Sequence, residues 1–331
     1  MADPTHRLRS PLAALFGALV GFGALAACSS GGDPDDVVAA PTTVAVAEEV
    51  TWVELWRDDF DGDAVDRAAW EPYYNTYGDG NAELACLTPD NLRVADGVLT
   101  IEARAESVTC PSGSTRRFTS GFIGSREVGR LYPLHGRFEI RARVPQAQGL
   151  WPAFWLRHAG GAAVAEVDIL EVFHSQRPGQ VAQTLHFPES TGRQVFSGWA
   201  TPPGGGADGW HTYAVEILPD DATGGLRFTF FVDDTVTGTH VEPDAPWRAA
   251  ADPDAAWDLA VNLAVGGRWV GEPDGTLGWL PEVGRCSLDL SEPAAGPTSC
   301  PTDGITAAVL PAAYEIDHVV VSVPAQSDDG Q

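Results

Sequence analysis

The sequence predicts an all-β fold, an antiparallel sandwich or barrel. Short runs of alternating hydrophobicity recur from Trp52 to about Val323. Turn residues separate them at short intervals, and no long helical period interrupts them, a pattern typical of antiparallel sheets. The chain has 331 residues, of which 44% are hydrophobic, so it can bury a sizeable core. Because all-β units of about 250 residues can form one domain, we place a single domain over residues 51–323.

The first 28 residues are predicted to be a targeting signal. His6, Arg7 and Arg9 precede an apolar run over residues 11–27, and "LAAC" ends at Cys28. This segment resembles a bacterial lipoprotein signal, in which Cys28 becomes the lipidated first residue. The alternative is a plain secretory signal with a chance cysteine. We therefore expect an exported, extracytoplasmic protein that a lipid anchors to the bacterial membrane.

The two ends of the chain outside the domain have the composition of flexible segments. Residues 29–50 are rich in Gly, Ser, Asp and Pro, which predicts a tether between membrane and domain. Residues 324–331 are expected to be a disordered tail.

Net charge limits the possible partners. The chain has 46 acidic and 20 basic residues, a formal charge of −26. Such a surface repels phosphate backbones and anionic lipid headgroups. We expect no nucleic-acid partner, membrane contact only through the lipid anchor, and a monomer.

Six segments carry the strand pattern most clearly. In "GRFEIRARV" (136–144), Glu139, Arg141 and Arg143 share one face and the apolar residues share the other. In "GLWPAFWLR" (149–157), Trp151 and Trp155 share a face. Rings and polar groups on one wet face favour a sugar cleft, although the two Trp could also be core. The other segments are 97–104, 226–234, 257–265 and 314–323.

The run "AEVDILEVFH" (165–174) raises a question of parity. On a regular strand Glu166 and Asp168 point to one face and Glu171 points to the other. A β-bulge at Ile169–Leu170 would return Glu171 to the face of the other two. Crowding three carboxylates favours protonation of one, which suits retaining glycoside hydrolysis. An acidic edge strand or a calcium site is the alternative interpretation.

Four cysteines remain after Cys28, and their spacing fits no metal site. Four cysteines allow three disulfide connectivities in an exported protein. We favour the pairs that are local in sequence, Cys86–Cys110 and Cys286–Cys300; free buried thiols are the alternative.

The carboxylate motif and its surroundings resemble family 16 of the glycoside hydrolases, the group that contains bacterial laminarinases. The resemblance covers nearly the whole chain after residue 50. Besides "EVDILE", it rests on these segments, which follow in the family's order: "GNAELACLTPDNLRVADGVLTIEAR", "FTSGFIGS", "GRFEIRARVPQAQGLWPAFWLR", "WHTYAVEILP", "NLAVGGRWVGEPDG" and "YEIDHVVVSV". It implies a jelly-roll β-sandwich with a concave glycan-binding cleft.

The resemblance also implies a role for individual residues. Glu166 is the expected nucleophile, Glu171 the general acid and then base, and Asp168 the residue that orients the nucleophile. The residues expected to bind glycan are Asn81, Glu139, Arg141, Trp151, Trp155, His186 and Trp269. For His186, an ordinary sheet histidine is the alternative.

No cofactor is expected for catalysis. A structural calcium ion is expected at Asp59, the Gly97 carbonyl and Asp317, because these positions correspond to a calcium site of the family.

The function that the resemblance implies is retaining, endo-acting hydrolysis of a laminarin-like β-1,3-glucan. Three alternatives remain. The chain could be a glycan-recognition protein that lost catalysis, a transglycosylase of envelope polysaccharide, or a hydrolase of galactan, agar or mixed-linkage glucan.

Overall fold

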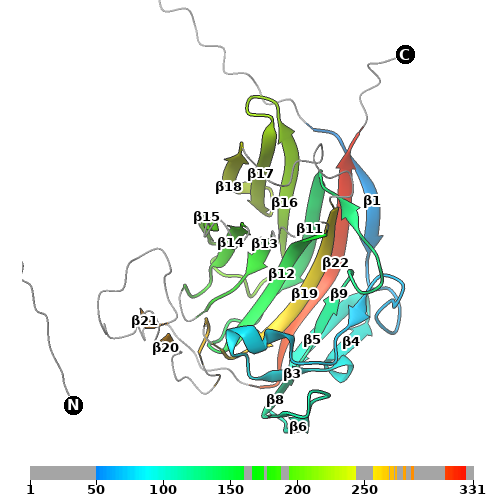
Figure 1. Cartoon of the computed structure of the whole chain (residues 1–331), viewed down its shortest axis with the longest axis vertical. Coiled ribbons are helices and arrows are strands. Elements are labelled where there is room, and N and C mark those ends of the chain that lie inside the picture. Colours follow the sequence, from blue (N-terminus) through cyan, green and yellow to red (C-terminus); the bar gives the residue numbers. More distant parts are fainter. Residues whose placement is uncertain are drawn as a thin grey trace, which may run out of the picture. The chain divides into compact units, whose positions relative to one another are not determined.

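Two eight-stranded antiparallel sheets form most of the computed structural model (Figure 1). It describes residues 50–159, 166–174, 177–187, 194–243, 256–267, 269–271, 273, 279–280, 285–286 and 310–325. The N-terminal signal, Cys28, nearly all of the tether and Cys300 lie outside these residues. Residues 49–331 form one compact unit.

The first sheet has the order β18-β17-β16-β11-β22-β5-β4, and β1 also pairs with β22. Its strands are β18 (Thr235–Glu242), β17 (Gly225–Val232), β16 (His211–Asp220), β11 (Gly136–Arg143), β22 (Ala312–Pro324), β5 (Val98–Ala103), β4 (Leu92–Ala95) and β1 (Trp52–Asp58).

The second sheet has the order β15-β14-β13-β12-β19-β9-β2, and β10 also pairs with β19. Its strands are β15 (Gln194–Ala200), β14 (Val181–His186), β13 (Glu166–Glu171), β12 (Leu150–Ala159), β19 (Ala256–Val265), β9 (Phe122–Gly124), β2 (Glu71–Pro72) and β10 (Tyr132–Pro133).

Short elements complete the described part of the chain. They are the parallel pair β3 (Ala85–Leu87) and β8 (Phe118–Ser120), the antiparallel pairs β6 (Val108–Thr109) with β7 (Thr115–Arg116) and β20 (Trp279–Leu280) with β21 (Arg285–Cys286), and the 3₁₀ helices η1 (Tyr77–Asn81) and η2 (Pro89–Asn91). No helix among the described residues has the length and apolar character needed to cross a lipid bilayer.

The core lies between the two large sheets. Phe138 and Ile140 of β11 and Phe154 and Leu156 of β12 belong to one buried cluster. Each strand contributes alternate residues to this layer, as its period of two requires. The outer face of the second sheet therefore carries the opposite set, including Trp151 and Trp155.

The predicted fold is confirmed, with one boundary moved. All six segments read as strands from the sequence are strands in the structure. Strand β22 extends to Pro324, which pairs with Trp52, and Ala325 donates a backbone hydrogen bond to Thr51. The final strand therefore runs beyond the expected boundary at residue 323, because pairing with β1 holds its last residues.

Candidate active site

Strand β13 contains the β-bulge that the parity argument predicted. In the ladder with β12, Leu170 pairs with Phe154 and Asp168 pairs with Trp155, so Ile169 has no partner. The ladder with β14 is shifted over the same residues, between Asp168 and Glu171. The extra residue in β13 therefore reverses the face of the sheet to which each later side chain of the strand points.

The bulge brings the three carboxyl groups together. Ile169 and Leu170 are both fully buried in the core between the sheets. Glu166, Asp168 and Glu171 consequently all line one pocket on the outer face of the second sheet. The other residues that line this pocket are Tyr77, Asn81, Glu83, Phe122, Trp151, Ala153, Trp155 and Asn262.

Hydrogen bonds from the neighbouring strands orient the pocket side chains. The Trp151 indole Nε1 donates to Glu171 Oε1 at 3.0 Å, and the Trp155 Nε1 donates to Asn262 Oδ1 at 2.8 Å. Both rings thus line the pocket while their polar atoms are satisfied. Such rings suit stacking on the apolar face of a sugar.

His186 lies next to the carboxylates, on β14. Its Nε2 is 3.0 Å from Asp168 Oδ2 and 3.8 Å from Glu166 Oε1. The three donor atoms all lie within 4.8 Å of one another, a spacing that a metal ion could bridge. His186 thus contacts Asp168 and lies next to Glu166.

Burial and mutual repulsion make the carboxyl groups hard to ionise. Burial raises the pKa of Glu171 well above its usual value, and the charges of Asp168 and Glu166 raise it further. Burial, followed by the charge of Asp168, raises the pKa of Glu166 to about 8. The Glu166 side chain is 32% exposed, whereas Glu171 is 7% exposed. Both glutamates are therefore harder to ionise than exposed carboxyl groups, and Glu171, the more buried of the two, is the harder one to ionise.

A buried arginine flanks Glu166. Arg157 is the ladder partner of Glu166 on β12, and directly opposed residues share a face of the sheet. The Arg157 guanidinium is held by Asp258, with Nε at 2.7 Å and Nη2 at 2.6 Å from Oδ1. Its positive charge lowers the pKa of Glu166 and so opposes the effects of burial and of Asp168. The sequence analysis missed Arg157, although it ends the segment "GLWPAFWLR".

Glu83 is a second carboxyl of the pocket that the sequence analysis missed. Its side chain packs against Gly78, where a Cβ would lie 1.9 Å from Glu83 Oε2, so a larger residue there would displace the Glu83 carboxyl group. The Asn81 Nδ2 donates to Glu83 Oε1 at 3.5 Å. Burial, with a smaller contribution from Asp79, raises the pKa of Glu83 to about 7. Its position in the motif "GNAELAC", two residues after Asn81, was the available signal.

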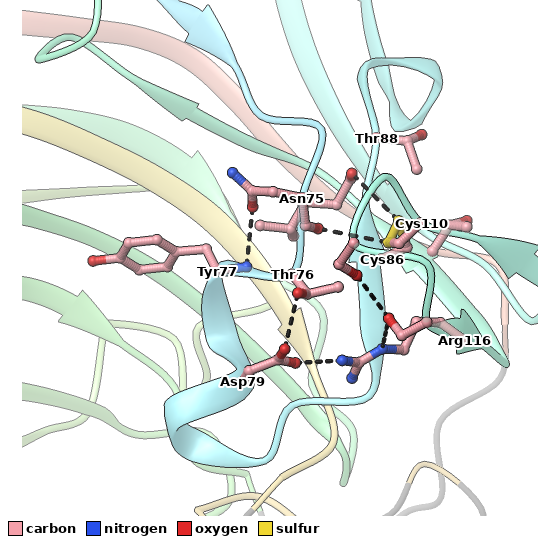
Figure 2. Close-up of a disulfide and its surroundings, with 12 residues drawn as sticks. Asn75, Thr76, Tyr77, Asp79, Cys86, Thr88, Cys110 and Arg116 are labelled. Atoms are coloured by element: carbon pink, nitrogen blue, oxygen red, sulfur yellow. Dashed lines mark hydrogen bonds and ion pairs between the residues drawn. A yellow bond between two sulfur atoms is a disulfide. The ribbon is translucent and has the colours of Figure 1, made fainter.

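Tyr77, Asn81 and Glu83 form one wall of the pocket. A disulfide and Arg116 stabilise the segment that contains Tyr77 (Figure 2). The disulfide is Cys86–Cys110, as predicted. Arg116 donates from Nη1 to the Glu83 carbonyl at 2.9 Å and also forms an ion pair with Asp79 in η1. In the other predicted pair, Cys286–Cys300, Cys300 lies outside the described residues.

Trp269 and Asn81 lie together, as predicted for two residues of one cleft. The Trp269 Nε1 donates to Asn81 Oδ1 at 3.4 Å. The Trp269 and Trp151 rings have centroids 6.4 Å apart. Trp269 thus extends the aromatic surface of the pocket.

Two residues predicted to bind glycan lie elsewhere. Glu139 and Arg141 belong to β11 in the first sheet, and their side chains point away from the core, on the face opposite to the second sheet. Glu139 accepts from Arg137 at 2.9 Å, and Arg141 forms an ion pair with Asp317 at 3.1 Å. The prediction was wrong because alternation shows which residues share a face, but not which sheet the strand joins.

The residues expected to bind calcium lie on neighbouring segments, because Ile316 pairs with Leu99 and Val319 pairs with Asp58. A Cβ on Gly97 would lie 3.8 Å from the Asp59 carbonyl oxygen and 3.7 Å from Asp61 Oδ1. The Asp59 carboxylate accepts from Arg57 Nε at 2.6 Å, and the Asp317 carboxylate is paired with Arg141. Each of these two carboxylates thus has an arginine on one of its oxygen atoms.

Residues 75–280 match the family model for glycosyl hydrolases family 16. The glucan endo-1,3-beta-glucosidase of Cryptopygus antarcticus is 33% identical over 249 residues, covering 69% of this chain and 87% of that protein. The beta-glucanase of Rhodothermus marinus is 34% identical over 240 residues, covering 67% of this chain and 78% of that protein. The solved laminarinase of Rhodothermus marinus superposes with a TM-score of 0.60 at 29% identity, over 84% of this chain and 99% of that one.

Proposed function

Because the chain belongs to family 16 of the glycosyl hydrolases, we propose that it is a retaining endo-β-glucanase that hydrolyses laminarin-like β-1,3-glucan. The observation that carries the proposal is the bulge at Ile169, which places Glu166, Asp168 and Glu171 in one pocket beside Trp151. Relatives named as endo-1,3-β-glucanases support the choice of substrate.

The two outer carboxyls divide the chemistry. The Glu166 carboxylate attacks the anomeric carbon while the Glu171 carboxylic acid gives its proton to the departing glycosidic oxygen. The sugar is then bound to Glu166 as an ester. Glu171, now ionised, removes a proton from water, which attacks the anomeric carbon and releases Glu166.

Asp168 and His186 prepare Glu166 for this attack. Asp168 is 3% exposed, and burial raises its pKa to about 8. Its hydrogen-bonding distance to His186 and its place between the two glutamates let it orient Glu166 and couple the two ionisations. Asn81, Trp151, Trp155 and Trp269 bind the sugar rings.

A polysaccharide panel tests the function. The purified protein is incubated with laminarin, mixed-linkage glucan, agarose and galactan, and the sizes of the products are measured. NMR then shows which anomer of the product forms first. We expect internal cleavage of laminarin with β-anomers formed first. Cleavage of a different polysaccharide alone would change the substrate. Binding without cleavage would favour a glycan-recognition protein, and products longer than the substrate would favour a transglycosylase.

The anchor and the ion are separate proposals. We propose that Cys28 carries lipid and that the enzyme acts outside the cytoplasm as a monomer, on the strength of the basic, apolar and "LAAC" segments alone. Cys28→Ala should move the protein from the membrane to the soluble fraction. The calcium at Asp59, Gly97 and Asp317 stays a prediction, and a titration followed by melting temperature tests it.

A further inference from the structure

The bulge in β13 creates a hydrogen-bonding problem that one side chain solves. Ile169 is the residue without a ladder partner on β12, and it is fully buried. A buried backbone carbonyl without a donor is costly in free energy. The Ile169 carbonyl instead accepts a hydrogen bond from Gln183 Nε2 at 3.1 Å.

Gln183 is placed on β14 so that it faces this carbonyl. Its neighbours Ala182 and Thr184 pair with Glu171 and Asp168, on either side of the bulge. Because side chains alternate along a strand, Gln183 points to the other face, toward the first sheet. It is 1% exposed, a rare environment for an amide in a core made mostly of apolar residues.

The rest of the Gln183 amide is bound to the first sheet. Nε2 also donates to the Phe231 carbonyl on β17 at 3.2 Å, and Oε1 accepts from Thr237 Oγ1 on β18 at 2.5 Å. Thr237 is itself skipped in the ladder between β17 and β18, where Phe230 pairs with Gly238 and Phe231 with Val236. One amide therefore links the irregularities of two strands in different sheets.

We propose that Gln183 is a positioning residue for Glu171: by binding the Ile169 carbonyl and the edge of the first sheet, it stabilises the bulged register that turns Glu171 into the pocket. The inference rests on the proposed function for its catalytic consequence. Gln183 touches neither substrate nor the reacting atoms. It acts through the backbone between Asp168 and Glu171.

The consequence follows from the alternative register. Without a donor for the Ile169 carbonyl, the bulge loses part of its advantage over a regular strand, on which Glu171 would face the core. Even a small shift of Glu171 would impair proton transfer to the leaving group, because a misplacement of about 1 Å can cost roughly a hundredfold in rate. The nucleophile Glu166 lies before the bulge and keeps its place.

The test separates an effect on proton donation by Glu171 from an effect on nucleophilic attack by Glu166 or on substrate binding. Gln183→Met has similar length and lacks both hydrogen-bonding groups. Two substrates are compared: laminarin, whose leaving group needs a proton, and an aryl β-glycoside of a β-1,3-gluco-oligosaccharide with a dinitrophenolate leaving group, which needs none. We expect kcat on laminarin to fall roughly ten- to a hundredfold while cleavage of the aryl glycosidic bond, followed as the dinitrophenolate burst, changes little.

Two further variants make the result specific. Val319→Ala creates a cavity on β22, two strands away from β16, which β13 contacts, and should lower the melting temperature without changing the ratio of the two rates. Thr237→Val removes the bond that anchors Gln183 Oε1 and should change the ratio in the same direction by a smaller factor. If Gln183→Met does not fold, the ratio of the two rates in Thr237→Val tests the proposal instead.

An unchanged rate ratio in Gln183→Met, or in Thr237→Val where the first variant does not fold, overturns the proposal. Failure of the positioning proposal can be distinguished from failure of the proposed function. If the wild type cleaves neither substrate, the function is wrong, and the crystal structure of Gln183→Met still tests the register: Glu171 retained in the pocket with Ile169 still bulged would overturn the positioning role.

Discussion

At the scale of single residues, the site depends on unequal environments for similar groups. Glu171 is buried and bound by the Trp151 indole, while Glu166 is about one third exposed and lies opposite Arg157. Glu171 is therefore the harder of the two carboxyl groups to ionise, which suits a proton donor at Glu171 and a nucleophile at Glu166. Their separation along β13 matters less than what surrounds each of them.

Removing either carboxyl should abolish turnover without unfolding the protein. We expect Glu171→Ala to lose roughly 10²- to 10⁴-fold in kcat on laminarin, the usual contribution of a general acid, and Glu166→Ala to lose nearly all activity. Azide should restore turnover of Glu166→Ala on an activated glycoside, with inverted product. Circular dichroism checks the fold. Wild-type rates in both variants would refute the assignment of roles.

Glu171 should also make stability depend on pH. Because burial raises the pKa of Glu171, the folded state holds this proton where the unfolded chain has lost it. The stabilisation is fully present below the unfolded pKa of about 4.3 and is lost as pH rises through the folded value. We expect the wild-type melting temperature to fall between pH 5 and pH 9 more than that of Glu171→Gln, whose amide never ionises.

The control for this measurement is Asp90→Asn, which alters an exposed carboxyl in η2. It should leave the slope of melting temperature against pH unchanged. Equal slopes for the wild type and Glu171→Gln would show that Glu171 is ionised in the folded protein at neutral pH, contrary to its burial.

At the scale of elements, the pocket is built from a rigid sheet and a braced loop. Strands β12, β13 and β19 supply Trp151, Glu171 and Asn262 from a framework of paired strands, in which β13 carries the bulge. The facing wall comes from η1 and the residues after it, which have few ladder bonds of their own. The Cys86–Cys110 disulfide and Arg116 replace the missing ladder (Figure 2).

Removing the disulfide should affect binding more than chemistry. We expect Cys86→Ser with Cys110→Ser to lose about 3 kcal/mol of unfolding free energy, the entropy of a loop of this length. Because the wall with Tyr77, Asn81 and Glu83 loses its brace, KM for laminarin should rise several-fold while kcat changes less. Urea unfolding and steady-state kinetics measure the two effects. An unchanged KM would mean that Arg116 alone holds the wall.

At the scale of the whole molecule, the fold begins with β1 and is closed by β22. Trp52 pairs with Pro324, so the first and last strands of the domain lie side by side in the first sheet (Figure 1). The structural unit spans residues 49–331, and its core draws on both large sheets. The pairing of the two terminal strands gives the domain a definite beginning at β1.

A protein that starts at Val50 should therefore fold as the full chain does. It keeps β1 and all residues of the pocket, so we expect the same melting temperature and the same kcat/KM on laminarin as for the complete chain in detergent. Light scattering should report a monomer, in keeping with the charge of −26. A lower melting temperature would show that the tether packs on the domain.

Sequence alone determined what depends on local pattern. Alternation along 136–144 and 149–157 identified strands and their faces, and the odd spacing of Glu171 required the bulge that β13 contains. A carboxylate facing an apolar core would be so costly that spacing sufficed for this inference. The family motif then supplied the roles of Glu166 and Glu171.

Tertiary structure decided what depends on contacts between distant segments. Glu139 and Arg141 alternate correctly, but long-range pairing of β11 with β16 and β22 places them on the sheet that lacks the pocket. Gln183 reads as one polar residue in an apolar strand until the bulge carbonyl of Ile169 lies 3.1 Å from its amide. A period of two fixes a side chain's face within a strand, whereas the partner it meets there depends on how the sheets stack.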